Sequence, residues 1–284
     1  MVTGHTIGTT LPAGFLVLCA PMNRESAPLI AAASPAEGPQ VLVQLSDCHL
    51  LADPAGRLRD IDVLANLHAV TAQIQQDGWR AQAILATGDI AHDGSQQAYG
   101  HFQQALAPLK TQVRVLPGNR DDGATMHDTL GTWCDPILDL GRHWRVVMLD
   151  STVRAARHGR LSGQQFALLD QAVAEAGDRH ILVAMHHNPV VDIGPVPDPA
   201  MLENARIMLT HLTAWRQARV LVWGHTHRAY DCRVDNMRLL AAPATSFQYA
   251  VADGRYVVDA VAAGYRWLKL YDDGSISTGV SRVA

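Results

Sequence analysis

The sequence has no apolar run that approaches the ~20 residues needed for a membrane-spanning helix, so we expect no contact with a membrane. A basic excess is also missing. The formal net charge is −4, which argues against a general nucleic-acid-binding protein, since such proteins usually present a basic face. After Pro39 the sequence shows no repeat, low-complexity tract or interdomain linker. What remains is a chain of 284 residues, 48% of them hydrophobic, which is enough for a substantial core.

Cysteine is scarce, and no two cysteines have the CxxC spacing of a structural metal site. Cys19, Cys48, Cys134 and Cys232 lie far apart in the chain. We interpret them as reduced thiols of a cytoplasmic protein, although an even count leaves disulfides open. Cys48 is expected to be a small buried residue rather than a metal ligand.

Positive charge is missing ahead of the apolar stretch 11–20, so the basic start of a signal peptide is absent. Residues 1–39 are rich in Ala, Pro, Gly, Ser and Thr. We expect them to form a disordered extension, with Met22 as an alternative start, followed by a single domain over residues 40–284. The expected location is the cytoplasm, and export by an atypical N-terminal signal is the alternative.

From Gln40 onward, apolar runs rich in β-branched residues alternate with amphipathic stretches. The amphipathic stretches predict helices over residues 61–76, 95–106, 122–130, 162–176 and 200–215. Ser162 is expected to cap the fourth helix. Two hairpins are predicted near the carboxyl terminus, with turns at Asp235-Asn236 and at residues 272–274. This order predicts one α/β domain with two packed mixed sheets flanked by helices.

Five short motifs contain residues that bind metal ions, and each follows an apolar run. They are Asp47-Cys-His49, Gly88-Asp89, Gly118-Asn119, His186-His187 and Gly224-His225-Thr-His227. Side chains alternate in an extended segment, so Asp47 and His49 are expected to share a face, as are the two histidines of the last motif. The glycines allow sharp turns and close approach. Carboxylate, amide and imidazole ligands suit a pair of borderline divalent ions better than a structural zinc.

The order of these motifs resembles that of the calcineurin-like metallophosphoesterase superfamily. Within it, the chain is similar to the class III 3′,5′-cyclic-nucleotide phosphodiesterases, of the cyclic AMP type. The stretches ATGDIAHDGSQQAY, LPGN, LLAAPATSFQ and YRWLKLYDDGSISTGV share this likeness, which covers about residues 41–283. The resemblance implies a four-layer αββα sandwich with two metal ions, Fe, Mn or Zn, at the strand ends.

The resemblance also implies a set of ligands for these ions. By the family's pattern, one ion is held by Asp47, His49 and His227, the second by Asn119, His186 and His225, and Asp89 bridges the two. His186 is preferred to His187 because it directly follows the strand.

The implied reaction is hydrolysis of a cyclic nucleotide, 3′,5′-cyclic AMP to AMP, by a metal-bound hydroxide. A small-molecule nucleotide is the expected partner, and the oligomeric state is left open. One alternative is a broad-specificity phosphodiesterase or phosphomonoesterase of the same superfamily. Another is a non-catalytic metal-binding scaffold, which the presence of all the ligands disfavours. Ser46 and Ser162 lack a His/Asp partner pattern, which argues against a serine hydrolase.

The third motif departs from the family, because Arg120 stands where relatives usually have His. Arginine does not donate a proton at ordinary pH, but its fork of donors can bind phosphate oxygens. We therefore expect Arg120, beside the catalytic Asn119 and Asp89, to give electrostatic help without acid catalysis. The alternative is a salt bridge from Arg120 to Asp121 or Asp122.

Substrate contacts are expected first from Asn119 and Arg120. His92 and His187 are weaker candidates: His92 could instead cap its loop, and His187 could instead be a packed strand-end residue. The Pro-rich stretch 188–199 is expected to form a loop at the rim of the pocket.

Overall fold

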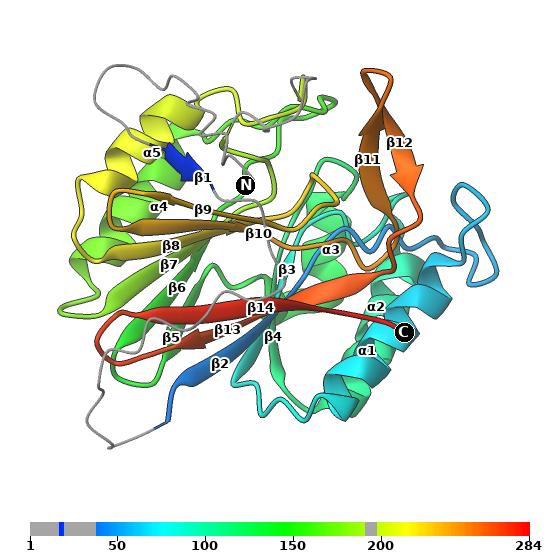
Figure 1. The fold of residues 1–284 in the computed structure, drawn as a ribbon, viewed down its shortest axis with the longest axis horizontal. Helices are drawn as coiled ribbons and strands as arrows, with labels where there is room; N and C mark the ends of the chain where they lie inside the picture. Colours follow the sequence, from blue (N-terminus) through cyan, green and yellow to red (C-terminus); the bar gives the residue numbers. More distant parts are fainter. Residues whose placement is uncertain (1–16, 20–37, 191–197) are drawn as a thin grey trace, which may run out of the picture.

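The computed structural model describes the backbone of residues 17–19 and all of residues 38–190 and 198–284. Its centre is a pair of mixed sheets (Figure 1). The first has five strands, in the order β14 (Ile276–Arg282), β13 (Gly264–Leu270), β2 (Gln40–Leu45), β3 (Ala83–Thr87) and β4 (Gln112–Leu116). Strands β2, β3 and β4 run parallel, and β13 returns from the end of the chain to pair antiparallel with β2.

The second sheet has seven strands. Their order is β1 (Val17–Cys19), β9 (Tyr230–Val234), β10 (Met237–Ala241), β8 (Ala218–Trp223), β7 (His180–Ala184), β6 (Trp144–Met148) and β5 (Ile137–Leu140). Strand β1 pairs antiparallel with β9 at one edge. Apart from β1 and residues 38 and 39, the extension expected over residues 1–39 lies outside the described residues.

Helices cover the outer face of each sheet. Helices α1 (Val63–Gln76), α2 (Gln96–Leu106) and α3 (Gly123–Leu130) pack on the five-stranded sheet, and α4 (Gly163–Ala174) and α5 (Ala205–Thr213) pack on the seven-stranded sheet. Within the described residues, none of these helices has the length and hydropathy to cross a membrane.

The alternation of side chains along each central strand explains the layers. On β3, Ile84 packs against the helices while Leu85 packs against the other sheet. On β7, Val183 packs against helices while Leu182 joins the core between the sheets. These strands are apolar throughout because both of their faces are buried. The predicted αββα sandwich is confirmed.

The helices begin and end near the predicted residues, and Ser162 caps α4 by accepting a hydrogen bond from the backbone N–H of Gln165. The last helix is shorter than predicted, because residues before Asn204 form turns. Both predicted hairpins are present. The sequence analysis missed β5 and a third hairpin, β11 (Gln248–Ala252) with β12 (Arg255–Asp259).

The sequence does contain a turn signal for the missed hairpin, the dipeptide Asp253-Gly254. Asp253 and Gly254 both have positive φ, of 50° and 68°, as a two-residue Asp-Gly turn between strands requires. The hairpin forms its own two-stranded sheet. In Figure 1 it extends away from the two main sheets, and the loop between β2 and α1 passes beside its base, where Arg59 contacts Tyr249.

We expect a chain that begins at Pro39 to fold as the full chain does. Strand β2 starts at Gln40, so this deletion leaves the five-stranded sheet complete, and it removes from the other sheet only the short edge strand β1. The midpoint of thermal unfolding, followed by circular dichroism, should shift by less than about 4 °C. Loss of a cooperative transition would show that residues 1–38 are part of the folded domain.

Candidate metal centre

The predicted ligands converge at one end of the two sheets. The first ligand of each motif follows the end of its strand by two or three residues: Asp47 after β2, Asp89 after β3, Asn119 after β4, His186 after β7 and His225 after β8. The parallel strands of each sheet bring their carboxyl ends to the same edge, and polar side chains there face one another.

The first group of ligands consists of Asp47, His49 and His227. One ligand atom from each lies within 4.8 Å of the others. Nε2 of His49 is 3.0 Å from Nε2 of His227, which in turn is 3.4 Å from Oδ1 of Asp47. All three side chains are buried.

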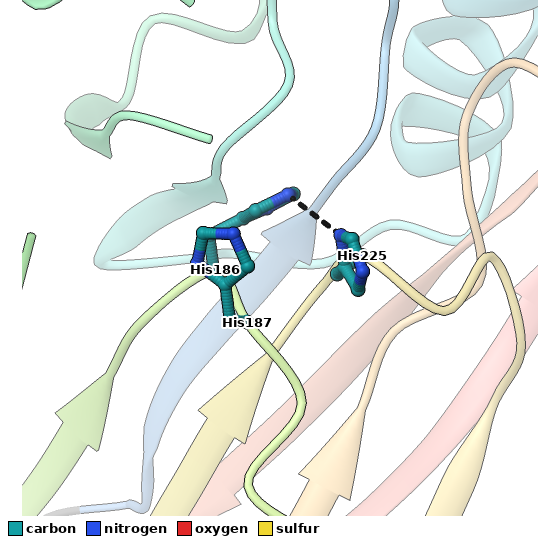
Figure 2. Close-up of side chains that lie close together, drawn as sticks. All are labelled: His186, His187 and His225. Carbon is teal, nitrogen blue, oxygen red and sulfur yellow. Dashed lines mark hydrogen bonds between the residues drawn. The ribbon is translucent and has the colours of Figure 1, made fainter. Parts of the chain in front are cut away.

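The second group consists of Asn119, His186 and His225. Nε2 of His186 is 3.3 Å from Oδ1 of Asn119 and 3.3 Å from Nδ1 of His225. Figure 2 shows His186, with its neighbour His187, facing His225 across the ends of β7 and β8. The other ring nitrogen of His225, Nε2, lies 3.5 Å from the carboxylate of Asp198.

Asp89 lies between the two groups. Its Oδ2 is 3.6 Å from Nε2 of His49, and its Oδ1 is 3.5 Å from Nε2 of His186. The backbone N–H of Arg120 also donates to Oδ1, at 2.8 Å. The two oxygens of this carboxylate thus face different groups, which is the geometry a bridging ligand needs.

The hydrogen bonds made by the second ring nitrogen of His186 and of His227 show that the ligand set suits metal cations. Nδ1 of His227 lies 2.7 Å from the carbonyl oxygen of Phe247, and Nδ1 of His186 lies 2.8 Å from that of Thr87. Because a carbonyl only accepts, each Nδ1 carries the proton and each Nε2 presents a lone pair. Burial lowers the pKa of His227 to about 3 and that of His49 well below its usual value. Unprotonated nitrogens that face one another and buried carboxylates need positive charge between them, as divalent ions supply.

The backbone at the ligands differs from the extended segments that the sequence analysis expected. Five ligand residues have positive φ: Asp47 (53°), His49 (51°), Asp89 (51°), His225 (66°) and His227 (49°). The extended conformation expected at these positions was therefore wrong, although Asp47 and His49 do lie in one group. Tight left-handed turns bring the side chains together, and each such residue costs about 1–3 kcal/mol that the surrounding structure must offset.

Two glycines let neighbouring motifs pack directly on each other. A Cβ at Gly118 would overlap the backbone nitrogen and Oδ1 of Asp89, and a Cβ at Gly224 would overlap Oγ of Ser46 and approach Oδ2 of Asp47 to 2.9 Å. These positions require close approach between strand ends, so glycine is needed at both.

Asp121 holds the second and third motifs together. Its carboxylate accepts hydrogen bonds from the backbone N–H groups of Ile90, Ala91 and Gly118 and from the hydroxyl of Tyr99. Arg120, in contrast, makes no ion pair with Asp121 or Asp122 within the described part of the chain.

The charge of Arg120 acts on the site instead. The side chain is exposed. Burial, and then the charge of Arg120, lower the pKa of His92. Burial raises the pKa of Asp89 to about 7, and the hydrogen bond from the Arg120 N–H and the charges of Arg120 and Arg157 oppose that rise. The positive charge of Arg120 therefore acts on groups at the site.

The weaker candidates occupy different environments. Nδ1 of His92 lies 3.1 Å from Nδ1 of His49, and the ring of His92 is partly exposed at the site. His187 is fully buried, with Nδ1 2.8 Å from Oγ of Ser151 and its ring packed beneath Gly159. Cys48 is buried in the core beneath the helices, as expected, and burial raises its pKa to about 12, so it is a neutral thiol.

Sequence reasoning missed several residues around the ligands: Arg59, Arg157, Asp198, Phe247 and Tyr249. Most come from loops or from the unpredicted hairpin, where no periodic pattern marks them. Phe247 lay within the quoted stretch LLAAPATSFQ, but nothing in that stretch indicated its contact with His49 and His227. Asp198 belongs to the expected rim loop, of which residues 191–197 lie outside the described residues.

The sequence is similar to known proteins over most of its length. Residues 41–229 match the model of the calcineurin-like phosphoesterase family. The chain is 40% identical over 245 residues to the 3′,5′-cyclic adenosine monophosphate phosphodiesterase CpdA of Pseudomonas aeruginosa, covering 86% of this chain and 90% of the relative. It is 32% identical over 246 residues to the protein of the same name from Escherichia coli K12, again covering 86% and 90%.

Solved structures share the fold at much lower identity. A dimetal phosphatase from Danio rerio is 12% identical with a TM-score of 0.62, covering 87% of this chain and 100% of that one. A purple acid phosphatase from yellow lupin is 14% identical with a TM-score of 0.60, covering 86% of this chain and 51% of that one. These likenesses support the αββα architecture.

We expect the Asp89→Asn variant to retain less bound metal than a variant that lacks a ligand of one group alone, such as His227→Ala. The carboxylate of Asp89 faces both groups, so its neutral amide weakens both. Metal analysis after purification should give well under one ion per chain for Asp89→Asn, against about two for the wild type. Circular dichroism serves as the folding control. A variant that retained two ions and normal turnover would contradict the bridging role.

Proposed function

Because the chain belongs to the calcineurin-like phosphoesterase family, we propose that it hydrolyses 3′,5′-cyclic AMP to AMP with two divalent ions, Fe, Mn or Zn, as cofactors. The observation that carries this proposal is the position of Asp89 between the two ligand groups. The substrate is supported by two relatives, 40% and 32% identical, that are named as cyclic AMP phosphodiesterases.

The ions would be held in the two groups already described. Asp47, His49 and His227 would hold one, and Asn119, His186 and His225 the other, with one oxygen of Asp89 toward each. Such ions, when bound, neutralise phosphoryl charge and supply an activated water for attack on phosphorus.

The chain's own residues contribute position and charge. The carbonyl groups of Phe247 and Thr87 fix the rings of His227 and His186, so the ligand atoms need little rearrangement. Arg120 and Arg157 supply positive charge to the site, and guanidinium groups of this kind can bind the oxygens of a phosphodiester. The leaving O3′ oxygen must take its proton from a group other than Arg120.

Arg120 also favours a second candidate function, a broader phosphodiesterase or phosphomonoesterase. A fixed cation at this position stabilises any phosphoryl oxygen. It favours hydrolysis of substrates whose leaving group departs without a proton. A non-catalytic scaffold is the less favoured alternative, because all predicted ligands converge in a geometry fit for metal ions.

We propose the cytoplasm as the location. The four cysteines lie far apart in the sequence and show no CxxC spacing, which suits a reducing compartment.

Three substrates separate these functions. The metal-loaded protein would be assayed with 3′,5′-cyclic AMP, with bis(p-nitrophenyl) phosphate and with p-nitrophenyl phosphate. We expect hydrolysis of cyclic AMP with AMP as the product. Turnover of the monoester alone, or of none of the three with both ions bound, would overturn the proposal.

We expect Arg120→His to raise kcat on cyclic AMP more than on bis(p-nitrophenyl) phosphate. A general acid is worth about 10²–10⁴-fold for a poor alkoxide leaving group, whereas nitrophenolate departs without a proton. Arg120→Ala should raise KM and slow both reactions, because it removes charge near the phosphodiester. Arg154→Ala, which removes an exposed arginine of the loop after β6, is the matched control. Equal gains on both substrates would show that residue 120 takes no part in leaving-group chemistry.

A further inference from the structure

Beside the metal ligands, an arginine and three aromatic rings form a continuous surface that the reaction described above does not use. We call it the aromatic wall, and it consists of Arg59, Phe247, Tyr249 and Tyr256. The guanidinium carbon of Arg59 lies 5.7 Å from the ring centre of Phe247 and 5.6 Å from that of Tyr249. Nη2 of Arg59 donates to the hydroxyl of Tyr249 at 3.3 Å, and the rings of Tyr249 and Tyr256 are 6.2 Å apart.

The wall is continuous with the first group of ligands. The ring of Phe247 stacks on that of His49, with centres 5.8 Å apart and planes at 16°. The ring of Tyr249 lies 4.9 Å from that of His227. A molecule whose phosphoryl group reached these histidines would therefore have the wall directly beside it.

The backbone holds Arg59 in a strained turn. Leu58 and Ile61 exchange backbone hydrogen bonds of 3.0 and 2.9 Å, so Arg59 and Asp60 form a two-residue turn with φ of 52° and 66°. Glycine or asparagine usually occupies such a turn. A bulky residue held in the left-handed region indicates a constraint on where its side chain must lie.

The aromatic side of the wall is fixed to the ligand loops. The side-chain amide of Asn66 donates to the carbonyl of Ser246, and the hydroxyl of Ser246 donates to the carbonyl of Asp47, both at 2.6 Å. The backbone N–H of Tyr249 donates to the carbonyl of His227 at 3.4 Å. These hydrogen bonds tie the segment that carries Phe247 and Tyr249 to the loops of the metal ligands.

The chemistry of the wall suits a flat heteroaromatic ring. Phe247 is 7% exposed and lies beneath the more exposed residues of the wall. Tyr249, Tyr256 and Arg59 keep part of their surface open to solvent. Nucleobases stack on aromatic rings and on the planes of arginine guanidinium groups. Arg59 lies near two rings and donates one hydrogen bond, from Nη2 to the hydroxyl of Tyr249, so we expect its guanidinium plane to be held where a flat ring can stack on it.

We propose that Arg59 and Tyr249 bind the nucleobase of the cyclic nucleotide, while the metal ligands and Arg120 take its phosphodiester. This inference rests on the proposed function. It makes the β11–β12 hairpin a specificity element, because β11 carries Tyr249 and β12 carries Tyr256.

The test compares two cyclic phosphodiesters that differ only in the base. The substrates are 3′,5′-cyclic AMP and methyl ribofuranoside 3′,5′-cyclic phosphate, in which a methoxy group replaces adenine. The variants are Arg59→Ala, Tyr249→Ala and Tyr249→Phe. Arg255→Ala, which removes an exposed arginine of the same hairpin, is the matched control.

We expect Arg59→Ala and Tyr249→Ala to lower the ratio of kcat/KM for cyclic AMP to that for the base-free substrate by about 5- to 150-fold, mainly through KM. Tyr249→Phe keeps the ring and should retain most of the ratio. Arg255→Ala should leave it unchanged. Loss of activity by the same factor on both substrates would overturn the proposal and assign the wall to phosphate binding or to support of the ligands.

A separate measurement distinguishes failure of this inference from failure of the proposed function. If the wild type did not hydrolyse cyclic AMP, the proposed reaction would fall. AMP would then be tested as a competitive inhibitor of methyl p-nitrophenyl phosphate hydrolysis. A higher inhibition constant in Arg59→Ala, with no change in Arg255→Ala, would still support base binding. Equal inhibition constants in all variants would overturn it.

Discussion

Two buried carboxylates, Asp47 and Asp89, lie close together at the site and constrain the residues around them. Burial raises the pKa of each to about 7; at Asp47 the charge of His186 opposes this rise and the charge of Asp89 adds to it. Both can be anionic together only where positive charge or hydrogen-bond donors lie beside them. The backbone supplies part of this, since the N–H of His225 donates to Asp47 and that of Arg120 donates to Asp89. The turns with positive φ and the closely packed glycines orient these backbone N–H groups toward the carboxylates. Metal ions would supply the remaining positive charge.

The sequence predicted the layers from its strands, and the strand ends also marked the polar residues that the structure brings together. Strands buried on both faces are apolar throughout, so their ends are easy to find, and a parallel arrangement brings those ends together. The conformation of the ends could not be predicted in the same way. Asp47 and His49 were expected to align because an extended chain alternates, yet both lie in left-handed turns. Turn conformation depends on contacts with other motifs, which are distant in sequence.

The aromatic wall escaped prediction for a related reason. Strands β11 and β12 are partly exposed on both faces, so they lack the alternation that marks a strand packed on a core. Arg59 and Tyr249 meet although 190 positions separate them in the sequence. The fold is shared with phosphatases that are 12–14% identical to this chain. Differences among such proteins are therefore expected in loops and hairpins of this kind, while the sheets keep the ligands in place.

Each group of ligands draws on both sheets. His49 comes from the five-stranded sheet and His227, 178 positions later, from the seven-stranded one, and Asn119 meets His186 in the same way across 67 positions. While the chain is being synthesised, the first half of each group emerges long before the second. A metal ion could meet a complete set of these ligands only once translation is nearly complete and the sheets have packed. The metal that the protein carries is then chosen by what the compartment offers to a finished fold, and the same polypeptide grown under different metal supply should carry different ions.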